Sequence, residues 1–340
     1  MDLLNYLLRR LALSAFVFLA VMTITFAISH LIPGNPIAAL LGPAAVEYPG
    51  LVVKLTQQYH LNDPIYVQYV YYLDNLAHGN LGYSSSKGFI PVSTVIAQTL
   101  PYTVQIVFFA FIFSIAFGIV FGVIAAKYSQ KAADTGIRSV YLAGISSPSF
   151  FVALIFLIAF TFFFRILPSG GAVGPSIAPP NLITGIPMLD ALLELNFRYE
   201  QSALAHVILP SLSLAVGATA IVIRVTRASM LQILTSNYVR TARAKGLSES
   251  TVLFKHALRN GMIPVVTLLS LLFYGMMGST LFVENIFAYP GMGQYVITAL
   301  TSNDYPGIMA TTLIFAAIII TANIVADVLY AVVDPQVRLG

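Results

Sequence analysis

Six long stretches without a charged side chain constrain this chain more than any other feature of its sequence. They run from Leu11 to Val46, Gly88 to Ala126, Ser139 to Phe164, Gln201 to Ile223, Asn260 to Val283 and Tyr305 to Ala326. Each contains the roughly 20 residues that an α-helix needs to cross about 30 Å of hydrocarbon. The sequence is 58% apolar and 9% charged, whereas soluble domains are roughly a quarter charged. We therefore predict an all-α polytopic membrane protein.

The expected division of the chain follows these stretches. Six transmembrane helices are predicted at about 10–31, 99–126, 139–164, 203–224, 262–284 and 306–330. Residues 1–31 form a short cytoplasmic stub and the first helix, 32–98 an extracytoplasmic segment with a small subdomain, 99–331 a five-helix core, and 332–340 a tail. A seventh uncharged run, Ile166 to Leu189, is rejected because its many Pro and Gly residues would leave backbone groups unpaired in hydrocarbon.

The distribution of basic residues predicts the orientation. The N-terminus, the segments 127–138 and 224–260 and the C-terminus hold Arg9, Arg10, Lys127, Lys131, Arg138, Arg224, Arg227, Arg240, Arg243, Lys245, Lys255, Arg259 and Arg338. The opposite side holds Lys54, Lys87, Arg165 and Arg198, although its segments are longer in total. Because cytoplasmic loops are enriched in Lys and Arg, both termini are expected in the cytoplasm of a cell (plasma or inner) membrane. The first span is interpreted as a retained anchor, since its apolar core is too long for a signal peptide.

The segment from Asn237 to Pro264 reads as a basic helix-turn-helix between two spans. Gly246 stands where a first helix would end, and Ser248 offers an N-cap hydroxyl for a second helix. Glu249 would then place a carboxylate at the positive end of that second helix. The expected cytoplasmic loop, 225–260, is therefore an ordered docking surface, although its basic residues could serve topology alone.

Motifs of enzymes and metal sites are absent from the sequence. It contains no GxxxxGK[ST] phosphate loop, no HExxH and no GxSxG, and its five histidines are scattered. It also has no Cys, which excludes disulfides and thiolate ligands. We expect no catalytic residue, no metal and no cofactor of its own, so that a partner must supply energy for any transport.

Polar and small residues inside the predicted spans have two readings. Gln105, Ser146, Ser147 and Ser149 are candidates for a translocation path, although such hydroxyls also bond within or between helices. Pro148 is expected to kink its helix. Asp327 is expected to be structural. Gly118, Gly122, Gly275 and Gly278 are expected to permit close helix packing.

The chain resembles permease subunits of ABC importers, in the form found in the dipeptide/oligopeptide family. The resemblance is carried by YVRTARAKGL (Tyr238–Leu247) with HALRN (His256–Asn260), and by NYLLRRLALSAFVF with SHLIPGNP, GNLGYS, GISSPSF, ILPSGG, VENIFAYPGMGQ, NDYP and ADVLYAVVDPQVR between Asn5 and Arg338. It is similar to the first of the two permeases of that family. The general importer pattern has Glu-Ala-Ala six residues before the glycine. This chain has Arg240, Thr241 and Ala242 there, so the acidic contact is not carried over.

The resemblance implies a type I importer fold and a set of partners. These are a second homologous permease, one or two ATPase subunits that bind ATP and Mg, and an extracytoplasmic substrate-binding protein, with no role for nucleic acid. It also implies that the first helix of the loop inserts into an ATPase cleft. Its residues are Tyr238, Arg240, Thr241, Ala242, Arg243, Ala244, Lys245, Gly246 and Leu247. Ala242 and Ala244 would permit close approach, and the basic side chains would pair with the partner.

The cargo and two other classes of protein stay open at this point. Relatives of this permease type are associated with peptides, oligosaccharides and nickel, and peptides are preferred. A self-contained channel or secondary transporter would need buried charge pairs or inverted repeats, neither of which the sequence indicates. A membrane scaffold without transport would direct its polar groups only at other helices.

Overall fold

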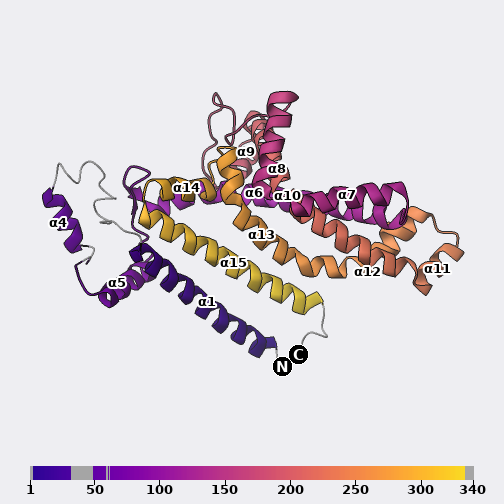
Figure 1. Ribbon diagram of the computed structural model, residues 1–340, viewed down its shortest axis with the longest axis horizontal. Coiled ribbons are helices and arrows are strands. Elements are labelled where there is room, and N and C mark those ends of the chain that lie inside the picture. Colours follow the sequence, from indigo (N-terminus) through magenta and orange to yellow (C-terminus); the bar gives the residue numbers. More distant parts are fainter. Residues whose placement is uncertain (1–2, 32–48, 59, 61, 334–340) are drawn as a thin grey trace. The chain divides into compact units, whose positions relative to one another are not determined.

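The computed structural model describes residues 3–31, 49–58, 60 and 62–333, and helices dominate it (Figure 1). The chain divides into two compact units. The terminal unit consists of the chain up to Tyr102 together with Pro290–Ile324, and the central unit consists of Thr103–Tyr289 together with the described residues from Val325 to Val333.

Five of the described helices are long and apolar enough to cross a membrane. They are α1 (Leu3–Leu31), α6 (Val92–Lys127), α10 (Phe197–Leu234), α13 (Ile263–Ile286) and α15 (Tyr305–Val333). A sixth span results if α7 (Ala132–Ser146) and the segment Ser149–Phe163 count as one, although they meet at an angle of 112°. The chain is thus a helical, polytopic protein with five or six candidate spans.

The expected third span, 139–164, is not one continuous helix. It begins early as α7, breaks at Ser147 and Pro148, and continues as α8 (Ser149–Phe156) and the π-helical turn η1 (Leu157–Phe163). Because a residue before proline is disfavoured in helical conformation, Ser147 is extended, with φ −95° and ψ 121°. The predicted kink at Pro148 is confirmed, but it is a sharp break between two helices.

The helices of the central unit also extend past their expected ends. The helix expected at 203–224 is α10, which begins at Phe197 because the side chain of Asn196 caps it, accepting a 3.1 Å hydrogen bond from the Tyr199 amide. It ends at Leu234, so residues 225–234 of the expected loop continue the helix. The span expected from 99 starts at Val92.

Helix α10 is the centre of its unit. It packs against α7, α8, α13 and the short helix α9 (Pro187–Leu193). Figure 1 shows α10 alongside α7 on its way to α11.

The Pro/Gly-rich segment Ile166 to Leu189, which was rejected as a span, is hydrogen-bonded to α9. The buried Asp190 carboxylate accepts hydrogen bonds from the Thr184 amide at 2.7 Å and hydroxyl at 2.6 Å.

The terminal unit contains further short helices and a hairpin. They are α4 (Pro49–Gln58), α5 (Ile65–Ala77), a hairpin of β1 (Tyr83–Ser84) and β2 (Ile90–Pro91), and α14 (Met292–Thr301). The aromatic run is α5, which contacts α1: the hydroxyls of Tyr69 and Thr23 are 2.7 Å apart. Helix α14 was not expected. The expected IPGNP turn, residues 334–340 of the tail and the side chain of Asp327 lie outside the described residues.

A buried carboxylate joins distant parts of the terminal unit. Asp304, immediately before α15, is fully buried and accepts hydrogen bonds from the Ser84 hydroxyl, from the Ser86 hydroxyl at 2.8 Å and from the Gly307 amide at 3.0 Å. Its bond to Gly307 caps the N-terminus of α15. Asp304 therefore fastens the hairpin to the last long helix. It stands beside an apolar core that includes Val92, Tyr295 and Ala310.

Candidate functional site

A folded helix-turn-helix follows α10, within residues 235–262. Its first helix is α11 (Asn237–Ala244), and its second runs through the π-helical turn η2 (Thr251–Ala257) into α12 (Leu258–Gly261). The turn is a Schellman motif, in which the Leu247 amide donates to the Ala242 carbonyl at 3.4 Å and the Gly246 amide to the Arg243 carbonyl at 2.9 Å. Gly246 has a φ of +77°, which explains why glycine ends this helix, as predicted.

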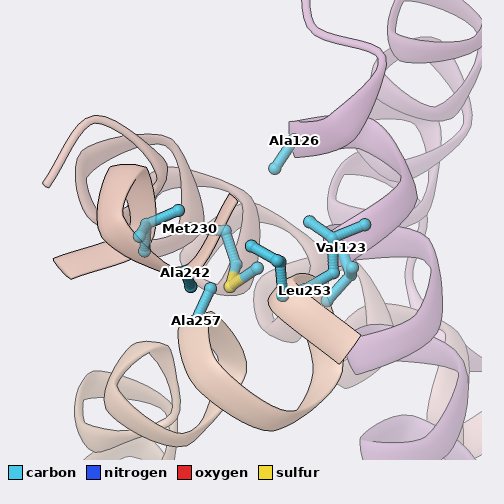
Figure 2. Close-up of a cluster of buried hydrophobic side chains, with 8 residues drawn as sticks. Val123, Ala126, Met230, Ala242, Leu253 and Ala257 are labelled. Atoms are coloured by element: carbon cyan, nitrogen blue, oxygen red, sulfur yellow. The ribbon is translucent and has the colours of Figure 1, made fainter. Parts of the chain in front are cut away.

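Eight buried side chains hold the helix-turn-helix against the ends of α6 and α10 (Figure 2). This packed cluster comprises Val123 and Ala126 of α6, Met230 of α10, Val239 and Ala242 of α11, and Val252, Leu253 and Ala257 of η2. Ala242 is 8% exposed and contacts its own chain, so the expectation that it faces a partner is corrected. The loop is a preformed element that is continuous with two long helices.

The opposite face of α11 is exposed. Its exposed side chains are Tyr238, Arg240, Thr241, Arg243 and Ala244, and they continue past the helix in Lys245 and Leu247. Tyr238 is tied back to the second helix, because its hydroxyl accepts a 2.9 Å hydrogen bond from the Asn260 side chain. Seven of the nine residues expected to dock are thus presented together, and Gly246 lies beside them as the exposed turn.

Arg243 has an acid partner within the loop itself. Its Nε and Nη2 donate to the two carboxylate oxygens of Glu249 at 3.1 and 2.8 Å, across the turn between the helices. This hydrogen bonding lowers the pKa of the Glu249 carboxyl below its usual value. Arg243 thus already has a partner within the loop, whereas Arg240 and Lys245 form no ion pair within the described residues.

A buried ion pair that the sequence analysis missed joins α7 to α10 near this loop. Arg227 Nε and Nη2 each lie 2.7 Å from an oxygen of Asp134, and the Asp134 side chain is 2% exposed. The Gln130 amide also donates to Asp134, at 3.0 Å. Arg227 lies in the last turns of α10, shortly before α11 begins at Asn237. The pair therefore ties α7 to the helix that leads into the loop.

A second missed group is the carboxylate of Glu284 near the end of α13. It is fully buried and accepts a 2.7 Å hydrogen bond from the hydroxyl of Thr103 on α6. Glu284 directly follows the uncharged run Asn260 to Val283, and Thr103 lies inside the predicted second span, but nothing in a single sequence pairs positions so far apart. Bonds of this kind connect helices within the central unit.

The four candidates for a translocation path separate into two groups. Ser147 and Ser149 line a cavity of about 270 Å³ bounded by α8, α10 and α13. Ser146 is exposed outside this cavity and donates to the Leu142 carbonyl at 3.0 Å. Gln105 is buried elsewhere, where its side-chain nitrogen contacts the sulfur of Met188. The structure thus brings two of the four together.

The glycines expected to serve helix packing also fall into two groups. A Cβ at Gly118 would collide with Val222 of α10, and one at Gly122 would lie 2.6 Å from Cβ of Thr226. These two pack closely, as predicted. A Cβ at Gly275 or Gly278 would meet no atom within 4 Å. For these two the packing prediction is wrong within the described chain, and Gly275 lines the cavity.

Comparison with known proteins agrees with this architecture. The sequence profile of the binding-protein-dependent transport system inner membrane component matches residues 118–339, and that of the N-terminal part of such membrane components matches residues 3–107. Both regions described above, the helix-turn-helix and the cavity, lie in the first match.

Similar proteins align over nearly their whole length. The probable D,D-dipeptide transport system permease protein DdpB of Escherichia coli (strain K12) is 37% identical over 94% of this chain and 93% of its own length. The di/tripeptide transport system permease protein DppB of Pseudomonas aeruginosa (strain UCBPP-PA14) is 36% identical over 98% and 99%. The oligopeptide transport system permease protein AppB of Bacillus subtilis (strain 168) is 34% identical over 98% and 99%. This chain therefore belongs to the family of binding-protein-dependent transport system inner membrane components.

Proposed function

We propose that this chain is the first of two permease subunits in an ATP-driven importer that takes peptides from an extracytoplasmic binding protein. The cargo is inferred from the relatives, whose names specify a D,D-dipeptide, di- and tripeptides, and oligopeptides. The observation that carries the coupling role is the preformed helix α11, with one face buried in its own chain and the other exposed and basic. ATP and Mg would be bound by separate ATPase subunits.

The proposed topology has six spans with both termini in the cytoplasm. The broken pair α7 and α8–η1 counts as the third span, and the helix-turn-helix lies on the cytoplasmic side. The concentration of Lys and Arg on this side supports the orientation. In this arrangement the extracytoplasmic segments 32–98, 165–202 and 285–304 face the binding protein.

Coupling would operate through rigid packing. The exposed face of α11, with Arg240 and Lys245, enters a cleft of an ATPase subunit. Closure of the ATPases moves the loop, and the packed cluster transmits this displacement to α6 and α10 because close-packed side chains cannot yield independently. The Asp134–Arg227 pair extends the moving body to α7.

The test is uptake by a reconstituted importer. The chain is assembled in proteoliposomes with its second permease, ATPases and binding protein, and ATP-dependent accumulation of a labelled dipeptide is measured. Arg240→Glu plus Lys245→Glu should lower uptake about tenfold or more, equivalent to about 1.4 kcal/mol of docking energy. Arg9→Glu plus Lys131→Glu is the matched control, because it makes the same charge change at exposed residues outside both the loop and the segments that face the binding protein.

Each other outcome identifies a different function. Equal uptake by the two double variants contradicts coupling through α11. Uptake without ATP indicates a secondary transporter or channel. Accumulation of an oligosaccharide or of nickel, but not of peptide, assigns the other cargo, and no uptake of any of them indicates a scaffold.

A further inference from the structure

The cavity bounded by α8, α10 and α13 has walls of an unusual composition. Its polar groups are the four serines Ser147, Ser149, Ser213 and Ser279, and no charged side chain lines it within the described residues. The remaining walls are aliphatic side chains, Met276 and two glycines. Its volume of about 270 Å³ is close to the lower limit of about 300 Å³ for ligand pockets.

The two glycines keep the cavity open. Gly217 of α10 and Gly275 of α13 both line it, and a Cβ on either would meet no atom within 4 Å. Glycine inside a helix costs about 1 kcal/mol relative to alanine. Neither glycine makes a close helix contact within the described chain, and both leave free space in the cavity.

The serine hydroxyls present acceptors to the cavity. Ser147 donates its proton to the Ala143 carbonyl at 2.8 Å, Ser213 to that of Leu209 at 2.8 Å, and Ser279 to that of Gly275 at 3.0 Å. A hydroxyl has one proton and two lone pairs, so each oxygen can still accept from a ligand. The cavity therefore matches a ligand that brings N–H donors and needs no counter-charge.

We propose that this cavity contacts the main chain of the peptide in transit, with the serine oxygens accepting hydrogen bonds from its N–H groups. This inference rests on the proposed function. Main-chain N–H groups occur at every residue except proline, so such contacts would tolerate many side chains. They would also be weak, because neutral hydrogen bonds contribute about 1 kcal/mol each, and a passage must release what it binds.

The same chemistry disfavours nickel at this place. Protein sites bind nickel through imidazole, carboxylate or thiolate groups. Among the residues that line the cavity in the described chain, none is His, Asp, Glu or Cys. The cavity is thus suited to the uncharged amide part of a peptide and not to its charged termini.

The absence of cysteine from the chain allows a direct test with single cysteines. Ser147→Cys and Ser279→Cys are assembled into the complete importer and treated with a charged, water-soluble methanethiosulfonate reagent. Ser146→Cys is the matched control, because Ser146 adjoins Ser147 but lies outside the cavity. Before the reagent is added, the importer is loaded with binding protein, with or without dipeptide, and arrested with ATP and vanadate. Modification of the two cavity cysteines should slow about tenfold at ~90% occupancy, and that of Ser146→Cys should not.

A second pair of variants fills the space. Gly275→Leu should block dipeptide uptake while leaving assembly and binding-protein docking intact, because the leucine enters open space and favours helix. Gly278→Leu is the control: it lies on the same helix, is equally unobstructed and does not line the cavity. Uptake by Gly278→Leu should equal that of the unmodified importer.

Three results would overturn the inference. They are cavity cysteines that do not react with the soluble reagent, cavity cysteines that react at the same rate with and without peptide, and a Gly275→Leu importer that transports like Gly278→Leu. Failure of the proposed function is a different observation, namely that the unmodified importer accumulates no peptide.

Discussion

Two regions of α10 use glycine in opposite ways. Towards its C-terminal end, Val222 and Thr226 lie so close to Gly118 and Gly122 of α6 that a Cβ on either glycine could not fit. Nearer its middle, Gly217 and its neighbour Gly275 of α13 face open space. The first region is packed into one body with the helix-turn-helix, and the second keeps a hollow. Glycine thus permits close helix packing in the first region and leaves open space in the second.

The packed region should depend most on its buried ion pair. Arg227→Met leaves the Asp134 carboxylate buried without its partner, and breaking such a pair costs about 3 to 5 kcal/mol. We expect a loss of about 3 kcal/mol in the free energy of unfolding, measured by denaturant titration in detergent. Adding Asp134→Leu should recover most of this loss, because an apolar pair of similar volume needs no desolvated charge. If the double variant is no more stable than Arg227→Met, the pair is not the cause.

One substitution placed in the two regions tests the comparison directly. Gly122→Ala should destabilise by about 1 to 3 kcal/mol, since its Cβ would lie 2.6 Å from Cβ of Thr226. Gly217→Ala should instead stabilise by up to about 1 kcal/mol through helix propensity. Thermal unfolding of both variants in detergent gives the two signs. Equal effects would show that the regions do not differ in packing.

The exposed pair in the turn should have the smallest effect. Glu249→Gln removes the partner of Arg243, whose side chain is 40% exposed, so we expect a loss of about 0.5 kcal/mol or less that shrinks further in high salt. The pair lowers the Glu249 pKa in the folded chain, so its contribution is present above the usual glutamate pKa of 4.5 and is lost as pH falls through the lowered value. The contribution of the pair is measured as the free energy of unfolding of both proteins, with and without the substitution, at pH 7 and at a pH below the lowered Glu249 pKa. A loss as large as that of Arg227→Met would contradict the contrast between exposed and buried pairs.

The sequence predicted what depends on local pattern. Uncharged length identified the membrane helices, and Gly246, Ser248 and Pro148 marked a helix end, a helix start and a break, because each of these residues acts through its own backbone or its nearest neighbours. The helix ends were less accurate. The length of an uncharged stretch predicts the part of a helix that lies in hydrocarbon. Helix α10 is longer than this part, because it continues to Leu234.

Properties that depend on partners far along the chain could not be predicted. Spacing alone does not show that Ala242 faces inward, that Arg243 is already paired, or that Asp134 contacts Arg227, 93 positions later. Nor does it separate Gly118 from Gly275, since both are glycines inside apolar helices. They differ in their surroundings: Val222 of α10 lies directly opposite Gly118, whereas no atom lies close to the Cβ position of Gly275.

The bonds of Asp304 also impose an order on the making of the protein. The hydroxyls of Ser84 and Ser86 leave the ribosome 220 and 218 residues before the carboxylate that they contact. Until Asp304 has been synthesised, the turn that carries these serines must satisfy its polar groups with water or with the insertion machinery. This turn of the terminal unit is thus completed by a residue made more than 200 positions later, and a chain shortened before residue 304 would leave both hydroxyls without this carboxylate.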